Sequence, residues 1–228
     1  EMKRRVDERD GTTPETVKSG KVATKWAENL IEAIDRSRRT TLERFLFGLG
    51  IQHVGESTAK ALAQWFGDLQ VIRRLPWPLF KQVPDIGGEV ARSLGHFLDQ
   101  PGNQQAIDDL LARGVVIGDT HAPSGKLRAG LDLATLLVDL EIPKVTRVRA
   151  EQLASAFPSV DALLDAPAHN FVTAGLPSDS ANAFTAWLED EANAKLLTRS
   201  GAALDELLAS TPEEVEVSAG PLDGKTVV

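Results

Sequence analysis

Two short stretches of the chain place a glycine directly before a run of helix-forming residues, in an arrangement suited to binding a phosphate. They are residues 51–55, followed by Ala59, and residues 83–87, followed by Ala91. Glycine permits a positive φ and lets bare backbone approach a partner closely. The N–H groups of such a turn and of the helix start after it can together hold one phosphate. Two such turns in series predict contacts with the backbone of a nucleic-acid duplex.

The candidate phosphate contacts lie in each turn and immediately after it. Around the first turn they are Gly50, His53, Gly55, Glu56, Ser57, Thr58 and Lys60. Around the second turn they are Gly87, Gly88, Arg92 and Ser93. Contacts to phosphate carry no base identity, so the predicted binding is independent of base sequence. It is also salt-dependent, since each neutralised phosphate adds about 0.9 to the slope of log affinity against log salt.

A purely structural role is the alternative for both turns, because a glycine beside a helix is commonly only part of its cap. The tandem arrangement favours the phosphate contact. His53 is expected to be a turn residue rather than a catalytic base, since the sequence suggests no carboxylate partner for it. The four tryptophans are expected to pack in the core rather than to stack on bases. The basic run at residues 36–39 fits a solvated helix end and a nucleic-acid contact equally well.

Charge is divided unevenly along the chain. The 25 basic and 33 acidic residues give a net charge of −8, which by itself disfavours binding to DNA. Residues 1–128, however, hold 19 basic and 17 acidic residues, whereas residues 129–228 hold 6 and 16. We therefore expect the two parts to do different jobs, with the polyanion contacts in the first.

Composition also argues against several classes of protein. The chain has no cysteine, so it can form no disulfide, thiol nucleophile or thiolate metal site, and its four histidines lie far apart in the sequence. No apolar run approaches the roughly 18 residues that span a bilayer. We expect a cytoplasmic protein with no membrane contact, and no cofactor or metal held by these residues themselves.

Helical spacing of apolar residues throughout the chain predicts an all-α fold, with strand-like alternation almost absent. The expected architecture is a tandem helix-hairpin-helix bundle, a degenerate second copy of it, and a short β-strand at the C-terminal end. The predicted segments are a charged N-terminal segment (1–20), the helix-hairpin-helix bundle (21–117), a linker (118–128), the second copy (129–210), an acidic linker (211–219) and the first strand of a domain cut short (220–228).

The second copy is recognised by an offset of 91 residues. It aligns apolar positions of the first part with apolar positions of the second, for example Ile51 with Ile142 and Phe66 with Phe157. With one deletion the match continues, and Asn103 meets Asn193. Matching core positions predict that the copy keeps the packing of the first part.

The turns of the copy differ in sequence from those of the first part. Glu141 stands in the place of Gly50, Thr146 in the place of Gly55, and Pro177 in the place of Gly87. We therefore expect the copy to have lost the permissive turns and to offer a phosphate neither free amides nor favourable charge. Residues 129–210 are predicted to be a structural or protein-contact module.

Four segments together resemble the helix-hairpin-helix domain of bacterial NAD-dependent DNA ligases. They are Lys25-Trp26-Ala27-Glu28-Asn29-Leu30, Phe45-Leu46-Phe47-Gly48-Leu49-Gly50-Ile51, His53-Val54-Gly55-Glu56-Ser57-Thr58-Ala59 and Val83-Pro84-Asp85-Ile86-Gly87. The resemblance covers about residues 22–115, and residues 222–228 are similar to the first strand of the BRCT domain that follows in that family. The chain departs from the family at residues 22–23, where a hairpin lacks its glycine, and at residues 129–210, which interrupt the usual short path to the BRCT strand.

This resemblance implies a parent enzyme that uses NAD, Mg²⁺ and a four-cysteine zinc module to seal nicks during DNA replication and repair. It implies that the present residues grip double-stranded, nicked DNA and carry no catalytic centre. The Lys-x-Asp-Gly motif that accepts AMP is missing, because Glu8 and Pro221 stand where its lysine is required. The alternative is a non-catalytic helix-hairpin-helix scaffold of another repair or recombination factor, with a protein partner bound by the acidic copy.

Overall fold

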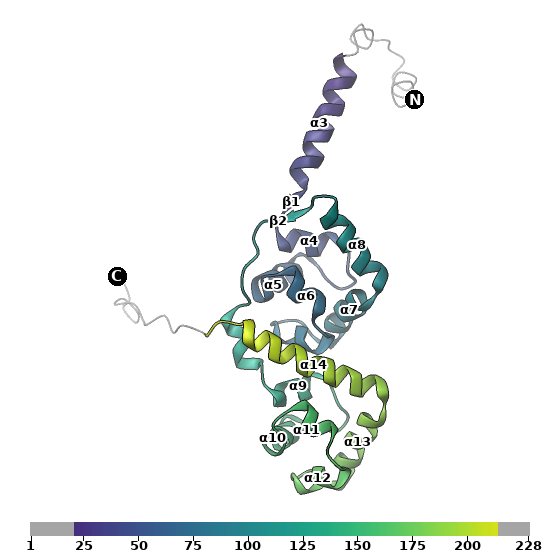
Figure 1. Ribbon diagram of the computed structural model, residues 1–228, viewed down its shortest axis with the longest axis vertical. Helices are drawn as coiled ribbons and strands as arrows, with labels where there is room; N and C mark the ends of the chain where they lie inside the picture. The colour runs from purple at the N-terminus through teal and green to yellow at the C-terminus, as the bar shows by residue number, and fades with distance from the viewer. Residues whose placement is uncertain (1–20, 214–228) are drawn as a thin grey trace, which may run out of the picture.

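The computed structural model describes residues 21–213 and is predominantly helical, which confirms the all-α fold class (Figure 1). The elements of the first half are α3 (Lys21–Ser37), β1 (Arg39–Thr40), α4 (Leu42–Gly48), α5 (Glu56–Phe66), α6 (Leu69–Arg74), η1 (Trp77–Gln82), α7 (Gly88–Asp99), α8 (Pro101–Ala112) and β2 (Val116–Ile117). Those of the second half are η2 (Gly125–Gly130), α9 (Leu133–Asp139), α10 (Arg147–Ala156), α11 (Val160–Leu164), α12 (Ala168–Thr173), α13 (Ser178–Glu189) and α14 (Glu191–Ser210). The strand predicted at residues 220–228 lies outside the described residues.

Local sequence signals account for the ends of the first helices. The Thr41 hydroxyl accepts a hydrogen bond from the Arg44 N–H and caps α4, whose apolar side buries Leu42. Helix α5 ends at Gly67, whose φ of 70° is a left-handed conformation that favours glycine. Both boundaries follow from the residue types at these positions.

Two very short strands close the first half of the molecule. They run parallel, pairing Arg39 with Val116 and Thr40 with Ile117. This pairing joins the residues before α4 to those after α8. The sequence gives no sign of it, since two residues are too few to show the alternation of a strand.

The segment predicted as a linker lies against the first half. The His121 N–H donates to the Gly67 carbonyl over 2.9 Å, and the Ser124 N–H donates to the Trp65 carbonyl over 2.8 Å. Leu127, in η2, is fully buried. These contacts fix where the second half begins relative to the first.

Helix α14 runs back from the second half across the first (Figure 1). Its Arg199 pairs with Asp99 over 2.6 Å, and its Glu206 lies 3.7 Å from Arg74. The buried apolar side chains of both halves form one continuous core. The two halves are therefore packed together rather than joined by a flexible connection.

The second half repeats the packing of the first in detail. The rings of Phe66 and Phe80 meet edge to face at 5.8 Å, and those of their counterparts Phe157 and Phe171 meet at 5.6 Å. The side-chain amide of Asn103 donates to the carbonyl six residues before it over 2.9 Å, and the Asn193 amide makes the same bond over 3.1 Å. The same ring pair and the same side-chain bond therefore occur at aligned positions of the two halves.

Helix α3 projects from the body of the molecule (Figure 1). The expectation that all four tryptophans pack in the core is wrong for Trp26, whose side chain is 58% exposed. Trp65, Trp77 and Trp187 do pack, partly buried, against the core. An apolar helical stripe identifies a face but not whether this chain covers it, which is why the prediction failed at α3. No helix among the described residues is long and apolar enough to cross a membrane.

Candidate nucleic-acid interface

The first hairpin, residues 49–55, is held by buried apolar side chains on either side of its turn. Gly50 and His53 have φ of 65° and 64°, and the Val54 N–H donates to the Ile51 carbonyl over 3.0 Å. Ile51 and Val54 are both buried. This anchoring aims the polar side of the turn outward, so that His53 and Gly55 are exposed.

Gly55 does not use the conformational freedom of glycine. Its φ of −87° and ψ of −178° are extended backbone, which any residue can adopt. A Cβ atom built there would meet nothing within 4 Å in the part of the chain that the structure describes. Neither the backbone conformation nor the packing of the described residues requires glycine here.

The second hairpin, residues 83–87, has the same geometry. The Ile86 N–H donates to the Val83 carbonyl over 3.2 Å, and the left-handed residue is Asp85, with a φ of 66°. Gly87 is extended, with a φ of −80°, and a Cβ there would again meet nothing within 4 Å among the described residues. In both hairpins the residue two positions before the helix cap is left-handed and is not glycine; the first hairpin has a further left-handed residue, Gly50.

Both helices after the hairpins begin with uncapped amides. The first intrahelical bond of α5 runs from the Ala59 N–H to the Gly55 carbonyl, and that of α7 from the Ala91 N–H to the Gly87 carbonyl. The preceding N–H groups of each helix have no carbonyl within their own helix, and no side chain caps either start. By contrast, α9 is capped by the Asp132 carboxylate. The starts of α5 and α7 have the donors that a phosphate needs.

An open groove lies between the first hairpin and α7. Six of its lining residues are Gly50, Gln52, Glu89, Arg92, Ser93 and His96. Three of these, Gly50, Arg92 and Ser93, belong to the sequence-predicted set. Gly55, Glu56, Ser57 and Lys60 are exposed at the start of α5, and Thr58 is half-buried there. Gly87 is exposed and Gly88 half-buried at the start of α7.

His53 bridges the hairpins through a carboxylate that the sequence did not suggest. Its Nε2 lies 3.3 Å from an oxygen of Glu89, in the first turn of α7. The two residues are 36 positions apart, so their pairing follows only from the packing of one hairpin beside the other. Both side chains are well exposed, which makes this a surface contact rather than a buried catalytic pair.

Arg92 is the best-placed cation of the second hairpin. Its guanidinium lies 4.5 Å from the centre of the Trp77 ring, a cation–π contact that holds its direction. The same guanidinium is paired with Glu141, which belongs to the second half of the chain. The sequence singled out Arg92 from its position after Gly87 but gave no indication of either neighbour.

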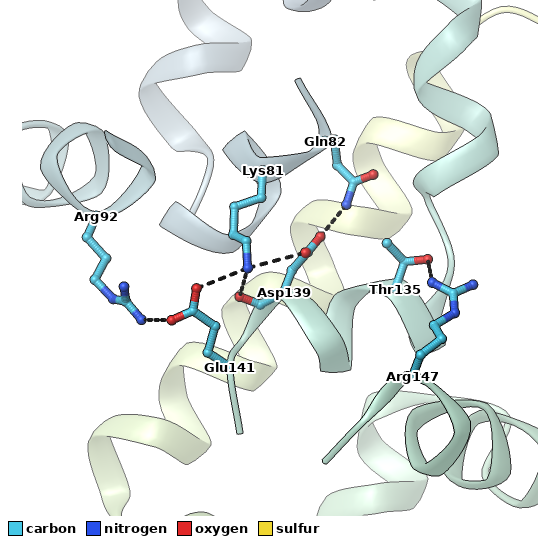
Figure 2. A network of polar contacts seen from close by, with 7 residues as sticks. All are labelled: Lys81, Gln82, Arg92, Thr135, Asp139, Glu141 and Arg147. Carbon is cyan, nitrogen blue, oxygen red and sulfur yellow. Dashed lines mark hydrogen bonds and ion pairs between the residues drawn. The ribbon is translucent and has the colours of Figure 1, made fainter. Parts of the chain in front are cut away.

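A polar network joins the two halves beside Arg92 (Figure 2). The Lys81 ammonium lies 3.1 Å from a Glu141 oxygen and 3.5 Å from an Asp139 oxygen, and it also donates to the Asp139 carbonyl over 3.3 Å. The Gln82 side-chain amide donates to the Asp139 carboxylate over 2.5 Å. These contacts join η1 to the last residue of α9 and to the turn that follows it.

The two carboxylates of this network differ in environment. Burial raises the pKa of Asp139, although its contacts with Lys81 oppose the shift. The hydrogen bond from Arg92 is the main cause of a lowered pKa at Glu141. Glu141 therefore stays ionised near the surface, where it neutralises part of the positive charge around the second hairpin.

The turn of the second half at residues 140–146 keeps the backbone of the first hairpin. Glu141 and Lys144 have φ of 54° and 63°, the Val145 N–H donates to the Ile142 carbonyl over 3.1 Å, and Thr146 has a φ of −82° and a ψ of 170°. The prediction that this turn was lost with its glycines is wrong. The expectation that it offers no free amides is wrong as well, because no side chain caps the start of α10 and its first intrahelical bond runs from the Ala150 N–H to the Thr146 carbonyl. Buried apolar anchors impose the turn, and a side chain is forced into the left-handed conformation.

Comparison with known proteins gives two findings. Residues 44–107, which contain both hairpins of the first half, match a family model described as "Helix-hairpin-helix motif". The chain is 65% identical over 209 residues to a protein named DNA ligase from Stenotrophomonas maltophilia, and 66% identical over 208 residues to one of the same name from Xanthomonas campestris pv. campestris. Each match covers 91% of this chain and about a quarter of the relative. The chain is thus similar to one segment of proteins named DNA ligase and contains a helix-hairpin-helix motif.

Proposed function

We propose that this chain is the duplex-gripping segment of an NAD-dependent DNA ligase that seals nicks in replication and repair. The two hairpins of the first half bind backbone phosphates of nicked, double-stranded DNA without reading its bases. The observation that carries the proposal is the pair of exposed glycines, Gly55 and Gly87, that neither backbone conformation nor packing among the described residues explains. The similarity to proteins named DNA ligase supports the choice of partner.

The chemistry of sealing belongs to other parts of such an enzyme. The residues of this chain do not fit the groups that the ligase resemblance implies. There is no cysteine for a four-cysteine zinc module, and no Lys-x-Asp-Gly sequence to accept AMP from NAD. The contribution of this segment is to hold the duplex at a fixed distance and direction, so that a nick can be presented to the remainder of the enzyme.

At each hairpin the phosphate would be bound by the free amides at the start of the helix, with a nearby cation for its charge. Lys60 supplies that cation after the first hairpin and Arg92 after the second. Ser57, Thr58 and Ser93 add hydroxyl donors at the same two helix starts. A side chain at Gly55 or Gly87 would keep the phosphate away from the amides.

The test is binding of the chain to a nicked duplex, measured by fluorescence anisotropy, for the wild type and for Gly55→Val/Gly87→Val. Valine adopts the extended backbone of both positions, and its Cβ would meet no atom within 4 Å among the described residues. Its weak capping is opposed by the entropy it removes from the unfolded chain, so stability should change by no more than about 1 kcal/mol. We expect affinity to fall at least about tenfold, the loss of one to two charge-assisted contacts.

The matched control is Gly102→Val/Gly118→Val. Both glycines also lack a contact for a new Cβ within the described residues, and neither has a positive φ or lies in a hairpin. The control should bind as the wild type does. Equal binding by the wild type and the hairpin variant would assign the glycines to capping, and the scaffold alternative would then be preferred.

A further inference from the structure

Glu141 occupies a position that makes its carboxylate a neighbour of the second hairpin. It stands where the first turn has Gly50, and it keeps the positive φ of that glycine although it has a side chain. Such a conformation is unfavourable for glutamate. The side chain is thereby directed away from its own turn, across the junction between the halves, and onto η1 and α7 (Figure 2).

The carboxylate of Glu141 lies beside the start of α7, between two cations. One of its oxygens accepts from the Arg92 guanidinium, and the other is 3.1 Å from the Lys81 ammonium. The same oxygen lies beside Gly88, so that a Cβ on Gly88 would collide with it. Gly88 and Arg92 are two of the residues assigned to the second phosphate.

The contact can open without unfolding the junction. The side chains of Glu141 and Arg92 are 40% and 51% exposed, whereas those of Lys81 and Asp139 are 17% and 13% exposed. Lys81 would keep Asp139 as a partner if Glu141 left, and Arg92 would keep the Trp77 ring. The inner pair, Lys81 and Asp139, therefore holds the halves together, while the outer pair, Arg92 and Glu141, is accessible to solvent.

We infer that Glu141 is a built-in competitor of the DNA backbone, an autoinhibitory contact in which the second half of the chain places a carboxylate on Arg92 of the second hairpin. This inference rests on the proposed function, since it requires that a duplex phosphate replaces the Glu141 carboxylate as the partner of Arg92. The acidic half thereby weakens binding at one hairpin and leaves the first hairpin free.

The test compares the wild type, Glu141→Gln and Glu191→Gln on the same nicked duplex over a salt series. Glu191→Gln is the charge-matched control, because Glu191 is also ion-paired, with Lys195 over 2.6 Å, and lies outside both hairpins. We expect Glu141→Gln to bind the duplex about fivefold more tightly than the control. The gain comes from freeing Arg92 to pair with a phosphate, and it is modest because these charges are exposed to water. Its log–log salt slope should steepen by up to about 0.9, one additional phosphate contact.

A second pair of variants shows whether the effect passes through Arg92. In the background of Arg92→Gln, the Glu141→Gln change should give no gain beyond that of Glu191→Gln. A gain of equal size with and without Arg92 would contradict the inference, because it would then reflect net charge alone. Equal affinity of Glu141→Gln and Glu191→Gln would also contradict it, and the role of Glu141 would then be only to link the two halves.

The two proposals fail in distinguishable ways. If Gly55→Val/Gly87→Val weakens binding while Glu141→Gln has no effect, the duplex grip stands and the competition by Glu141 is overturned. If no variant, Glu141→Gln included, binds the duplex at low salt, both are overturned. Binding by Glu141→Gln where the wild type binds weakly supports both.

Discussion

The turns at residues 50–55 and 141–146 share one backbone conformation but present different side chains at the surface. Their left-handed positions, their hydrogen bonds and the extended caps at Gly55 and Thr146 correspond closely. The first turn has glycine where the second has Glu141 and Thr146. Since the second turn folds without those glycines, the fold does not demand them in the first. The difference separates residues that build the hairpin from residues that leave its surface without side chains.

The junction between the halves should show the largest effect on stability. Lys81→Met leaves Asp139 with a poorly hydrated charge and without its cation, so we expect the free energy of unfolding to fall by about 2–4 kcal/mol. Lys195→Met removes an exposed cation and should cost less than about 1 kcal/mol. Urea denaturation measures both changes. A similar small loss for the two variants would mean that the halves do not depend on this contact.

The shared packing of the two turns can be tested at their alanines. Ala59 and Ala150 are both fully buried at the starts of α5 and α10. Replacing either by leucine overpacks the same kind of site, and each change should cost about 1–3 kcal/mol. Ala192→Leu, at an exposed helical position, is the control and should be nearly neutral. A cost confined to Ala59 would show that the second copy packs more loosely than the first.

Strain in the second turn should be relieved by glycine. Lys144 has a φ of 63°, and Lys144→Gly should raise stability by about 0.5–1 kcal/mol, the relief of the left-handed conformation less the added freedom of the unfolded chain. Thr146→Gly is the matched change at an extended position and should give no gain. Thermal unfolding of the pair decides the point. A stabilisation by Thr146→Gly alone would contradict the assignment of strain to the left-handed residue.

Acid should weaken the outer contact of the junction, between Arg92 and Glu141, and not the inner contact, between Lys81 and Asp139. The hydrogen bond from Arg92 lowers the pKa of Glu141, so its contribution to stability is present above the unfolded pKa and is lost as the pH falls through the folded pKa. Burial raises the pKa of Asp139, so ionised Asp139 costs stability above that pKa and the cost disappears as the pH falls through it.

The stability difference between the wild type and Glu141→Gln measures the first of these effects. It should be largest at neutral pH, by less than about 1 kcal/mol for so exposed a pair, and should vanish well below the pKa of Glu141. Asp139→Asn supplies the comparison, since it removes the opposite pH dependence. A difference between wild type and Glu141→Gln that persisted unchanged into acid would show that charge is not the source of the contact.

Much of this fold could be predicted from the sequence because it depends on local patterns. Helix ends at Thr41 and Gly67, the all-α class and the repeat at an offset of 91 all follow from residue types and spacing. The short β1–β2 pairing and the return of α14 across the first half could not, since both depend on contacts between distant segments.

The candidate site divides in the same way. The glycines of both hairpins and Arg92 were found from spacing alone. The contacts of Arg92 with Trp77 and Glu141 and of His53 with Glu89 were missed, because they arise only when the hairpins and the two halves pack together. The loss expected at residues 141–146 was wrong for a related reason. Buried anchors such as Ile142 decide the turn more strongly than the residue in its left-handed position.

The most direct test of the account is the salt dependence of binding to a nicked duplex for the wild type, Gly55→Val and Gly87→Val measured singly. If each hairpin holds one phosphate, each single change should reduce the log–log slope by about 0.9, while Gly102→Val leaves it unchanged. Slopes that stay equal across all four proteins would contradict the claim that the bare backbone of these hairpins grips the DNA.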